Sequence, residues 1–361
     1  MIQHLSSIKR KKTQPIKLGN VTIGGNSPIT VQSMTNTQTQ DIDATVAQIQ
    51  KLESSGCEII RIAVPDMDSA MAISQIKKQI SIPLIADIHF DYRLAIAAAE
   101  NGADGLRINP GNIGSTSSIA KVVEKAKEKH LAIRIGVNSG SVEKDLLKKY
   151  DGPTAQAMVD SALKHIQLMH SMDFYNIKIS IKASDVPRTL AAYRLLSEKT
   201  NAPLHLGVTE AGTLVSGTVK SSLGIGMLLA EGIGDTFRVS LTRDPVEEIK
   251  VAYEILRALN IRRRGPEIIS CPTCGRTAIP LFEIVETVEQ KLQHITQDIK
   301  IAIMGCVVNG PGEAREADIG IAGGDGTGIL FQKGKIVKKL PQDQLIDALV
   351  KAVEDLCRDN Y

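Results

Sequence analysis

Three cysteines and one carboxylate in the last quarter of the chain could together hold a metal cofactor. Cys271 and Cys274 are separated by Pro-Thr, and a tight turn there lets two thiolates converge. Cys306 follows an apolar run and opens a Gly/Pro-rich loop, which brings Glu313 back toward the same site. Thiolates select iron–sulfur clusters or zinc. One oxygen ligand beside three sulfurs suggests that one metal corner can open, as in catalytic metal sites.

The Cys-x-x-Cys pair by itself is also typical of zinc sites and of disulfide exchange. A structural zinc site needs a second pair of ligands, and none follows Cys306, whereas a thioredoxin-like motif would not need Cys306. An electron-transfer cluster needs a fourth cysteine, but Cys57 and Cys357 lie in apolar helical surroundings that favour a packing role. Glu313 is therefore the best candidate for the fourth ligand.

The segment before these cysteines repeats a short apolar strand, a polar turn and an amphipathic helix. The expected strands are Ile29–Thr35, Ile59–Val64, Leu84–His89, Gly105–Asn109, Ala132–Asn138, Asn176–Lys182, Leu204–Thr209 and Thr236–Leu241. Strand–helix alternation predicts an α/β protein with parallel strands, and this many units favour a closed (β/α)8 TIM barrel. An open doubly wound sheet would carry a phosphate fingerprint after its first strand, which is absent here.

The pattern changes after the barrel. We expect a barrel domain over residues 1–260, a linker over 261–267 and a small α/β domain over 268–361 that carries the cysteines. Residues 19–25 read as a hairpin that plugs the barrel floor. Residues 139–152 lengthen one connection and predict a lid or an extra helix, and residues 323–328 predict a hairpin turn.

Polar residues interrupt the barrel strands with strict alternation. Lys178, Ser180 and Lys182 alternate with isoleucines, so the polar side chains share one face. Since the other face packs on helices, the polar face must line the lumen near its catalytic end. Similar positions in other strands add the cations Arg61, Arg107, Arg134 and Arg238.

So many confined cations need an anion, and the nearby acids Asp87 and Glu210 are too few to offset them. Guanidinium groups bind phosphate oxygens well. The excess of cations in the lumen therefore predicts a small diphosphate substrate. Asp87 and His89 are expected to bind substrate hydroxyls, although a metal pair is an alternative. Arg238 and Lys178 could instead belong to structural ion pairs at the barrel floor. His205 is expected to be a core histidine, and Glu210 a functional carboxylate.

Composition excludes several classes of function. The net charge of +3 and the aromatic content of 3% argue against nucleic-acid binding. The chain has no apolar run of about 18 residues and its first residues do not resemble a signal peptide, so we expect no membrane span. Clustered cysteines favour a reducing compartment, and hence a cytoplasmic protein.

The motifs as a group resemble those of the bacterial 4-hydroxy-3-methylbut-2-en-1-yl diphosphate synthase family, iron–sulfur reductases of the methylerythritol phosphate route to isoprenoids. The resemblance covers nearly the whole chain. It rests on residues 29–35, 86–90, 105–114, 134–140, 182–185, 206–212 and 238–241 and on the two cysteine motifs, 271–276 and 305–313. Gly275 is the one departure, since some family members have Ser there.

This resemblance implies specific roles. Cys271, Cys274, Cys306 and Glu313 would hold a [4Fe–4S] cluster, and Asp87, His89 and Glu210 would lie near the carbon and hydroxyl end of the substrate. The diphosphate of 2-C-methyl-D-erythritol 2,4-cyclodiphosphate would be bound by Arg61, Arg107, Arg134, Asn138, Lys182 and Ser240. Two electrons, passed singly through the cluster from flavodoxin or ferredoxin, would open the ring and give (E)-4-hydroxy-3-methylbut-2-enyl diphosphate. Family members are homodimers in which one chain's cluster domain covers the other's barrel.

Two other classes of function fit parts of the sequence. A barrel aldolase with a structural zinc domain would use Lys182 as a Schiff-base lysine. A cluster-containing sensor would bind nucleic acid, against which the charge and the scarce aromatic residues argue.

Overall fold

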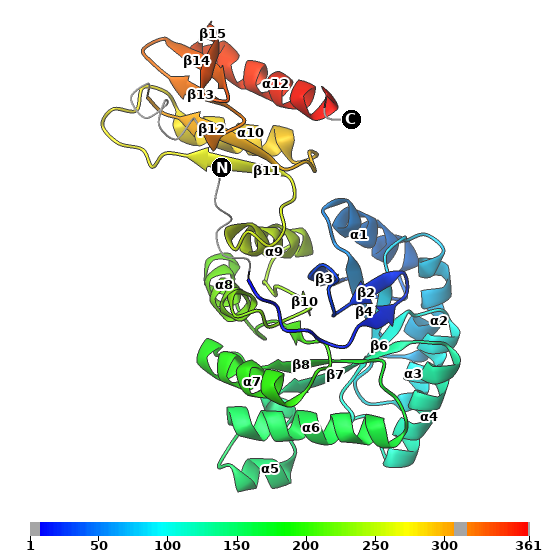
Figure 1. The fold of residues 1–361 in the computed structure, drawn as a ribbon. Helices are drawn as coiled ribbons and strands as arrows, with labels where there is room; N and C mark the ends of the chain where they lie inside the picture. The colour runs from blue at the N-terminus through cyan, green and yellow to red at the C-terminus, as the bar shows by residue number, and fades with distance from the viewer. Residues whose placement is uncertain (1–7, 307–315, 360–361) are drawn as a thin grey trace. The chain divides into compact units, whose positions relative to one another are not determined.

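The computed structural model describes residues 8–306 and 316–359. The chain divides into two compact units, Met1–Arg262 and Arg263–Tyr361, each with its own hydrophobic core (Figure 1). Glu313 and the rest of the loop after Cys306 lie outside the described residues. Among the described residues, none of the helices combines the length and the apolar composition needed to cross a membrane.

The first unit is a parallel barrel, as the sequence predicted. Its strands are β3 (Thr30–Met34), β4 (Ile59–Ala63), β5 (Leu84–Asp87), β6 (Gly105–Ile108), β7 (Ala132–Asn138), β8 (Ile177–Lys182), β9 (His205–Leu206) and β10 (Thr236–Phe237). They are ordered β8-β7-β6-β5-β4-β3-β10-β9. A parallel bridge between Ile179 and Leu204 brings β8 to the start of β9 and completes the ring.

Helices cover the outside of the ring (Figure 1). They are α1 (Ile42–Ser54), α2 (Met67–Lys77), α3 (Tyr92–Glu100), α4 (Thr116–Glu128), α6 (Ala155–Ser171), α7 (Val186–Lys199), α8 (Leu214–Ala230) and α9 (Pro245–Ala258). Most begin at an Asp, Ser or Thr whose side chain accepts a first-turn amide, as Asp185 does from Arg188. The long connection after β7 contains a 3-10 turn (Ser139–Ser141) and the extra helix α5 (Lys144–Lys149).

A hairpin closes the floor of the barrel, as predicted. β1 (Ile16–Leu18) and β2 (Val21–Ile23) pair antiparallel around a turn at Gly19 and Asn20. Ile16, Leu18 and Ile23 pack against Ile59, Ile85 and Ala132, which lie at or near the starts of their strands. The open end of the lumen is therefore the end at which the strands finish, where barrels of this kind bind substrate.

The second unit contains one mixed sheet with helices on one face. Its strands run in the order β11 (Pro266–Ser270), β12 (Ile299–Met304), β13 (Ile319–Gly323), β14 (Thr327–Gln332) and β15 (Lys335–Pro341). α10 (Leu281–Leu292) and α12 (Leu345–Asp359) pack on the face that presents Ile301, Ile303 and Ile321. The turn between β13 and β14 was predicted, whereas β15 was missed. β11 begins inside the segment expected to be a linker.

Candidate functional site

Cationic side chains gather inside the barrel. Arg61, Arg107, Arg134, Lys178 and Lys182 are buried, and the register pairs Arg107 with Arg134 and Arg134 with Lys178. Paired positions on adjacent parallel strands point to the same side of the sheet. The strand alternation therefore stacks these side chains along the lumen.

Asp87 is the acid that ties part of this group together. One of its oxygens lies 3.1 Å from Arg107 Nη1, and the other lies 3.6 Å from Arg61 Nε and 3.6 Å from His89 Nε2. Burial works against the carboxylate charge, but Arg61, His89 and Arg107 together hold the pKa of Asp87 below its usual range. Asp87 is therefore an ionised acceptor at neutral pH, and His89 reaches from it toward solvent with a side chain that is 55% exposed.

A second acid, Glu248 of α9, was missed in the sequence. It is buried and accepts from Arg238 (Nε at 3.3 Å and Nη2 at 3.2 Å), from the Ser33 hydroxyl and from the Leu241 amide. Arg238 thus belongs to a structural ion pair, as the alternative supposed, but the pair lies just after the end of β10 and not at the barrel floor. Glu248 follows another glutamate in the first turn of a surface helix, where acids usually interact with the helix dipole, so no local signal marked it as buried.

In the part of the chain that the structure describes, the other cations of the lumen (Arg134, Lys178 and Lys182) form no ion pair within 4.0 Å, unlike Arg61, Arg107 and Arg238. Among the described residues, Arg134 Nε and Nη1, Lys178 Nζ and both ring nitrogens of His205 have no hydrogen-bond partner. Burial, followed by the nearby Arg134 and Arg61, lowers the pKa of both Lys178 and Lys182 well below the usual lysine value. Burial and the same cations lower the pKa of His205. His205 is thus buried as expected, but it lacks the partners of an ordinary core histidine.

Two glycines make room for the cations. A β-carbon added at Gly136 would lie 2.8 Å from Arg107 Nε, and one added at Gly207 would lie 2.5 Å from Lys182 Nζ. Both distances are shorter than any normal contact. The absence of a side chain at these positions therefore sets how far Arg107 and Lys182 extend into the lumen.

The other candidate residues lie near the ends of the strands. Asn138 ends β7 and pairs in register with Lys182, the last residue of β8. Ser240 follows β10 and is half-buried. Glu210 follows β9 in an exposed position with a left-handed backbone (φ 51°), which costs a non-glycine residue roughly 1–2 kcal/mol. Such strain is concentrated at functional sites.

The cysteines gather around the ends of β11 and β12. The Gly305 amide donates to Cys271 Sγ at 3.4 Å, and the Ala278 amide donates to the Gly305 carbonyl. The Cys274 amide donates to Thr277 Oγ1 at 3.1 Å, which closes the turn that follows the Cys-x-x-Cys pair. Cys306 directly follows Gly305, so all three cysteines belong to one small region of the second unit.

The donor set in this region fits a thiolate-bound metal centre. An amide directed at a sulfur atom, as from Gly305 to Cys271, is the kind of hydrogen bond that tunes iron–sulfur clusters. Among the described residues, no three His, Cys, Asp or Glu side chains are grouped closely enough to hold a metal ion. The candidate fourth ligand, Glu313, lies outside those residues.

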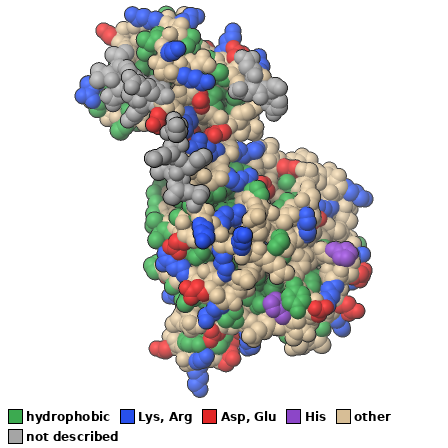
Figure 2. Space-filling model, viewed as in Figure 1, with side chains coloured by type: hydrophobic (Ala, Val, Ile, Leu, Met, Phe, Trp, Pro, Cys, Tyr) green, Lys and Arg blue, Asp and Glu red, His purple; other side chains and the backbone are tan. Residues whose placement is uncertain are grey.

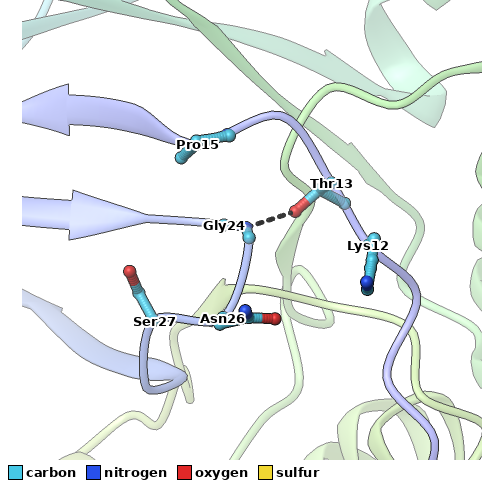
Figure 3. A pocket seen from close by; sticks show the side chains of 7 residues that line it. Lys12, Thr13, Pro15, Gly24, Asn26 and Ser27 are labelled. Carbon is cyan, nitrogen blue, oxygen red and sulfur yellow. Dashed lines mark hydrogen bonds between the residues drawn. The ribbon is translucent and has the colours of Figure 1, made fainter.

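A surface pocket of about 520 Å³ lies at the opposite end of the barrel from the cations, beside the floor hairpin. Figure 3 shows Thr13 at its wall, where its hydroxyl accepts from the Gly25 amide at 3.2 Å. The same hydroxyl donates to Asp235, which also pairs with Arg10. These polar groups hold the N-terminal segment against the barrel floor, and we assign the pocket a structural role.

Comparison with known proteins places these features in a family. Residues 13–253 match the GcpE TIM-barrel domain and residues 267–355 match the GcpE protein C-terminal domain. A protein of Caldanaerobacter subterraneus named 4-hydroxy-3-methylbut-2-en-1-yl diphosphate synthase (flavodoxin) is 59% identical over 97% of this chain and 99% of its own length. A protein of the same name from Geobacter sulfurreducens is 56% identical over 98% of this chain and 100% of its own length.

The barrel fold also occurs outside this group. A solved dihydropteroate synthase from Stenotrophomonas maltophilia superposes with a TM-score of 0.51 at 13% identity, over 69% of this chain and 98% of its own. That likeness concerns the fold alone. Because the two family models together cover both units and the relatives match nearly end to end, the chain belongs to the GcpE family.

Proposed function

We propose that the chain converts 2-C-methyl-D-erythritol 2,4-cyclodiphosphate into (E)-4-hydroxy-3-methylbut-2-enyl diphosphate. The observation that carries the proposal is the group of buried cations in the lumen, which the two acids Asp87 and Glu248 only partly neutralise. A diphosphate provides the missing negative charge. The name shared by relatives that are 56–59% identical supports the same reaction.

The diphosphate is held by Arg61, Arg107, Arg134, Asn138, Lys182 and Ser240. Desolvated cations bind phosphate oxygens strongly, because little water competes inside the lumen. As the ring opens, negative charge grows on the phosphate oxygen that leaves carbon. The guanidinium groups are already positioned to stabilise that charge, so they lower the barrier as well as bind the substrate.

Asp87, His89 and Glu210 act on the carbon and hydroxyl end. Asp87 is held as a carboxylate by its arginine partners and accepts a hydrogen bond from a substrate hydroxyl. His89 lies within reach of the same end and is exposed enough to meet the substrate. Glu210 is the candidate proton donor or charge stabiliser as a hydroxyl leaves as water.

Cys271, Cys274 and Cys306, with Glu313 as the fourth ligand, are proposed to hold a [4Fe–4S] cluster. When bound, such a cluster would pass two electrons from the external donor to the substrate one at a time. The Gly305 amide, which donates to Cys271 Sγ, orients this thiolate and moderates its charge. Glu313, as an oxygen ligand, would bind iron more weakly than the three thiolates, and we propose that it would allow one metal corner to open.

We further propose that the cysteines belong to a domain over residues 268–361, joined by a linker (261–267) to a barrel domain over 1–260. Flavodoxin, which appears in the names of the relatives, is the proposed electron donor, in preference to ferredoxin. The proposed setting is the cytoplasm.

The working form is proposed to be a homodimer. An exposed apolar stripe on α8 supports self-association: Val215, Val219, Leu223 and Met227 recur every four residues and are 42–76% exposed. Lys220 is the one charged residue of this helix, so little charge opposes pairing of two identical stripes. Sedimentation of the protein across a concentration series, with Val219→Glu as the disrupting variant, tests this assignment.

The aldolase alternative is not favoured. The lowered pKa of Lys182 would suit a Schiff base, but the family match extends over both units. Anaerobic turnover of the cyclodiphosphate with reduced flavodoxin, followed by phosphorus NMR, tests the proposed reaction. The expected result is loss of the cyclic diphosphate signals and appearance of a linear diphosphate. Trapping of a carbonyl substrate on Lys182 by borohydride, without such turnover, would favour the aldolase instead.

A further inference from the structure

Four lysines lie together at one edge of the second unit. Lys333 lies in the turn between β14 and β15, and Lys335, Lys338 and Lys339 lie on β15, the last strand of the sheet. All four side chains are exposed. In the view of Figure 2, Lys and Arg side chains gather along the edge of this unit where Figure 1 labels β15.

These ammonium groups are not used within the unit. None of the four has an ion pair within 4.0 Å among the described residues, whereas the lysine of α10, Lys291, lies 2.6 Å from Asp347. Residues 333–339 contain no acid. The edge is therefore a local concentration of uncompensated positive charge, which can steer an oppositely charged partner over roughly 10 Å at physiological salt.

An apolar contact surface lies among these charges. Ile336 is 67% exposed and Val337 is 58% exposed, and both lie between the lysines in the sequence. The strand register shifts beside them, between Leu330 and Phe331, which turns part of this edge away from the regular ladder. Apolar residues rimmed by charge are typical of protein docking sites.

The register connects this edge to the cysteine region. Lys339 pairs with Ile329, Ile329 pairs with Ala322, and Ala322 pairs with Met304, which lies two residues before Cys306. Three strand spacings of about 4.8 Å each separate Lys339 from Met304, a distance of about 14 Å. A partner that contacts the edge at Lys339 therefore lies beside the sheet end that carries the cysteines.

We propose that the edge formed by Lys333, Lys335, Ile336, Val337, Lys338 and Lys339 docks an acidic flavodoxin, which delivers its electrons to the cysteine-bound centre of the same unit. The proposal rests on the proposed function for the identity of the electron acceptor. Complementary charge accelerates the encounter, and the small apolar centre keeps the complex short-lived, as repeated single-electron deliveries require.

Lysines on an edge strand also have a simpler use, since they prevent two sheets from pairing edge to edge. In that role, the lysine charges repel a second copy of the chain. Edge protection therefore predicts that replacing the lysines changes self-association but does not change flavodoxin binding. The two roles are therefore separated by changing the sign of the charge and measuring donor binding and self-association in the same samples.

The test compares two variants with equal changes of charge in the full-length, anaerobically prepared protein. Lys338→Glu/Lys339→Glu alters the proposed edge, and Lys291→Glu/Lys351→Glu alters the helical face of the same unit. Binding of oxidised flavodoxin is measured by titration at low and high salt, and turnover is measured with flavodoxin and with a small chemical reductant. Binding does not depend on the substrate, so it tests the edge even if the proposed reaction is wrong.

The edge variant is expected to weaken flavodoxin binding and to raise the KM for flavodoxin by about tenfold or more. Turnover with the chemical reductant should stay within about twofold of the wild type, and salt should weaken only the wild-type and helical-face complexes. Equal flavodoxin binding by both variants would overturn the proposal. Unchanged binding combined with self-association of the edge variant would assign these lysines to edge protection instead.

Discussion

Gly207 lies so close to Lys182 that a β-carbon on the glycine would come within 2.5 Å of the lysine Nζ and 2.9 Å of the Arg238 carbonyl oxygen. The backbone oxygen cannot move easily, so the lysine must give way. The reach of Lys182 into the lumen is thus set by a residue on the neighbouring strand connection. The positive charge at this site comes from Lys182, whereas the space for its side chain depends on Gly207.

Gly207→Ala should therefore weaken substrate binding without removing any charge. We expect the dissociation constant for the cyclodiphosphate to rise by about tenfold, the equivalent of one displaced charge-assisted hydrogen bond. Titration calorimetry measures this effect. Gly140→Ala is the matched control, because a β-carbon there meets nothing within 4 Å; an equal loss of affinity in both variants would contradict the spatial argument.

Arg134 should contribute directly to substrate affinity. Two of its nitrogens have no partner among the described residues, so they are available to phosphate oxygens. Arg134→Met should raise the dissociation constant by about ten- to hundredfold, since hydrogen bonds to charged groups contribute roughly 1.5–3 kcal/mol. Arg194→Met removes an exposed arginine that pairs with Glu231 and serves as the control. An unaltered dissociation constant for Arg134→Met would show that this residue faces elsewhere.

Lys178 should make the free protein less stable at neutral pH than above pH 10. Burial lowers its pKa in the folded state, so the folded protein binds this proton less tightly than the unfolded chain does, and the difference destabilises the fold at neutral pH. This loss of stability becomes smaller as the pH rises toward the pKa of lysine in the unfolded chain, about 10.4. Lys178→Met should raise the free energy of unfolding at pH 7 by about 1–3 kcal/mol and flatten its rise with pH.

Urea unfolding at a series of pH values measures both effects. Lys351→Met changes an exposed lysine and should leave the profile unaltered. A destabilised Lys178→Met protein at pH 7 would mean that the amine is charged and paired in the free protein.

Substrate binding should be accompanied by proton uptake. A diphosphate beside Lys178, Lys182 and His205 favours their charged forms, so their pKa values rise on binding. Affinity should accordingly increase as pH falls through the range between the bound and free pKa values. Calorimetry in buffers of different ionisation enthalpy counts the protons, and an enthalpy independent of the buffer would refute this coupling.

Glu313 should affect catalysis more than cofactor retention. Glu313→Ala is expected to keep most of the iron, because three thiolates remain, but to lose activity. Cys306→Ser removes a thiolate and should lose much of the iron as well. Iron content and turnover, measured on the same anaerobic samples, separate the two cases. Unchanged turnover of Glu313→Ala would rule out a role for this carboxylate.

The barrel was predictable because its signal is local and repeated. The alternation of Lys178, Ser180 and Lys182 with isoleucines indicated both the strand and the lumen face, and the hairpin at the floor followed from its turn residues. Glu248 was missed because its partner Arg238 lies on another element and its helix position looks like an ordinary surface acid. The pairing of Glu248 with Arg238 depends on closure of the barrel, and the local sequence pattern does not reveal it.

The strand β15 was missed for a related reason. Its sequence, Lys-Ile-Val-Lys-Lys-Leu-Pro, lacks alternation because only Leu340 is buried. An edge strand pairs with only one neighbouring strand and buries few apolar side chains. In the sequence, the lysines of β15 therefore look like those of a loop. The cysteine site is predicted as a set of candidate ligands from residue type and spacing, and that assignment stays a prediction. The position of Glu313 relative to the three sulfurs does not follow from spacing alone.

Analysis of anaerobically purified protein would show whether three thiolates and a carboxylate hold an iron–sulfur cluster that serves the cationic barrel. Iron, acid-labile sulfide and zinc are measured per chain together with the visible absorption spectrum. We expect a brown protein with about four iron and four sulfide per chain. A colourless protein that carries a single zinc ion would contradict this assignment.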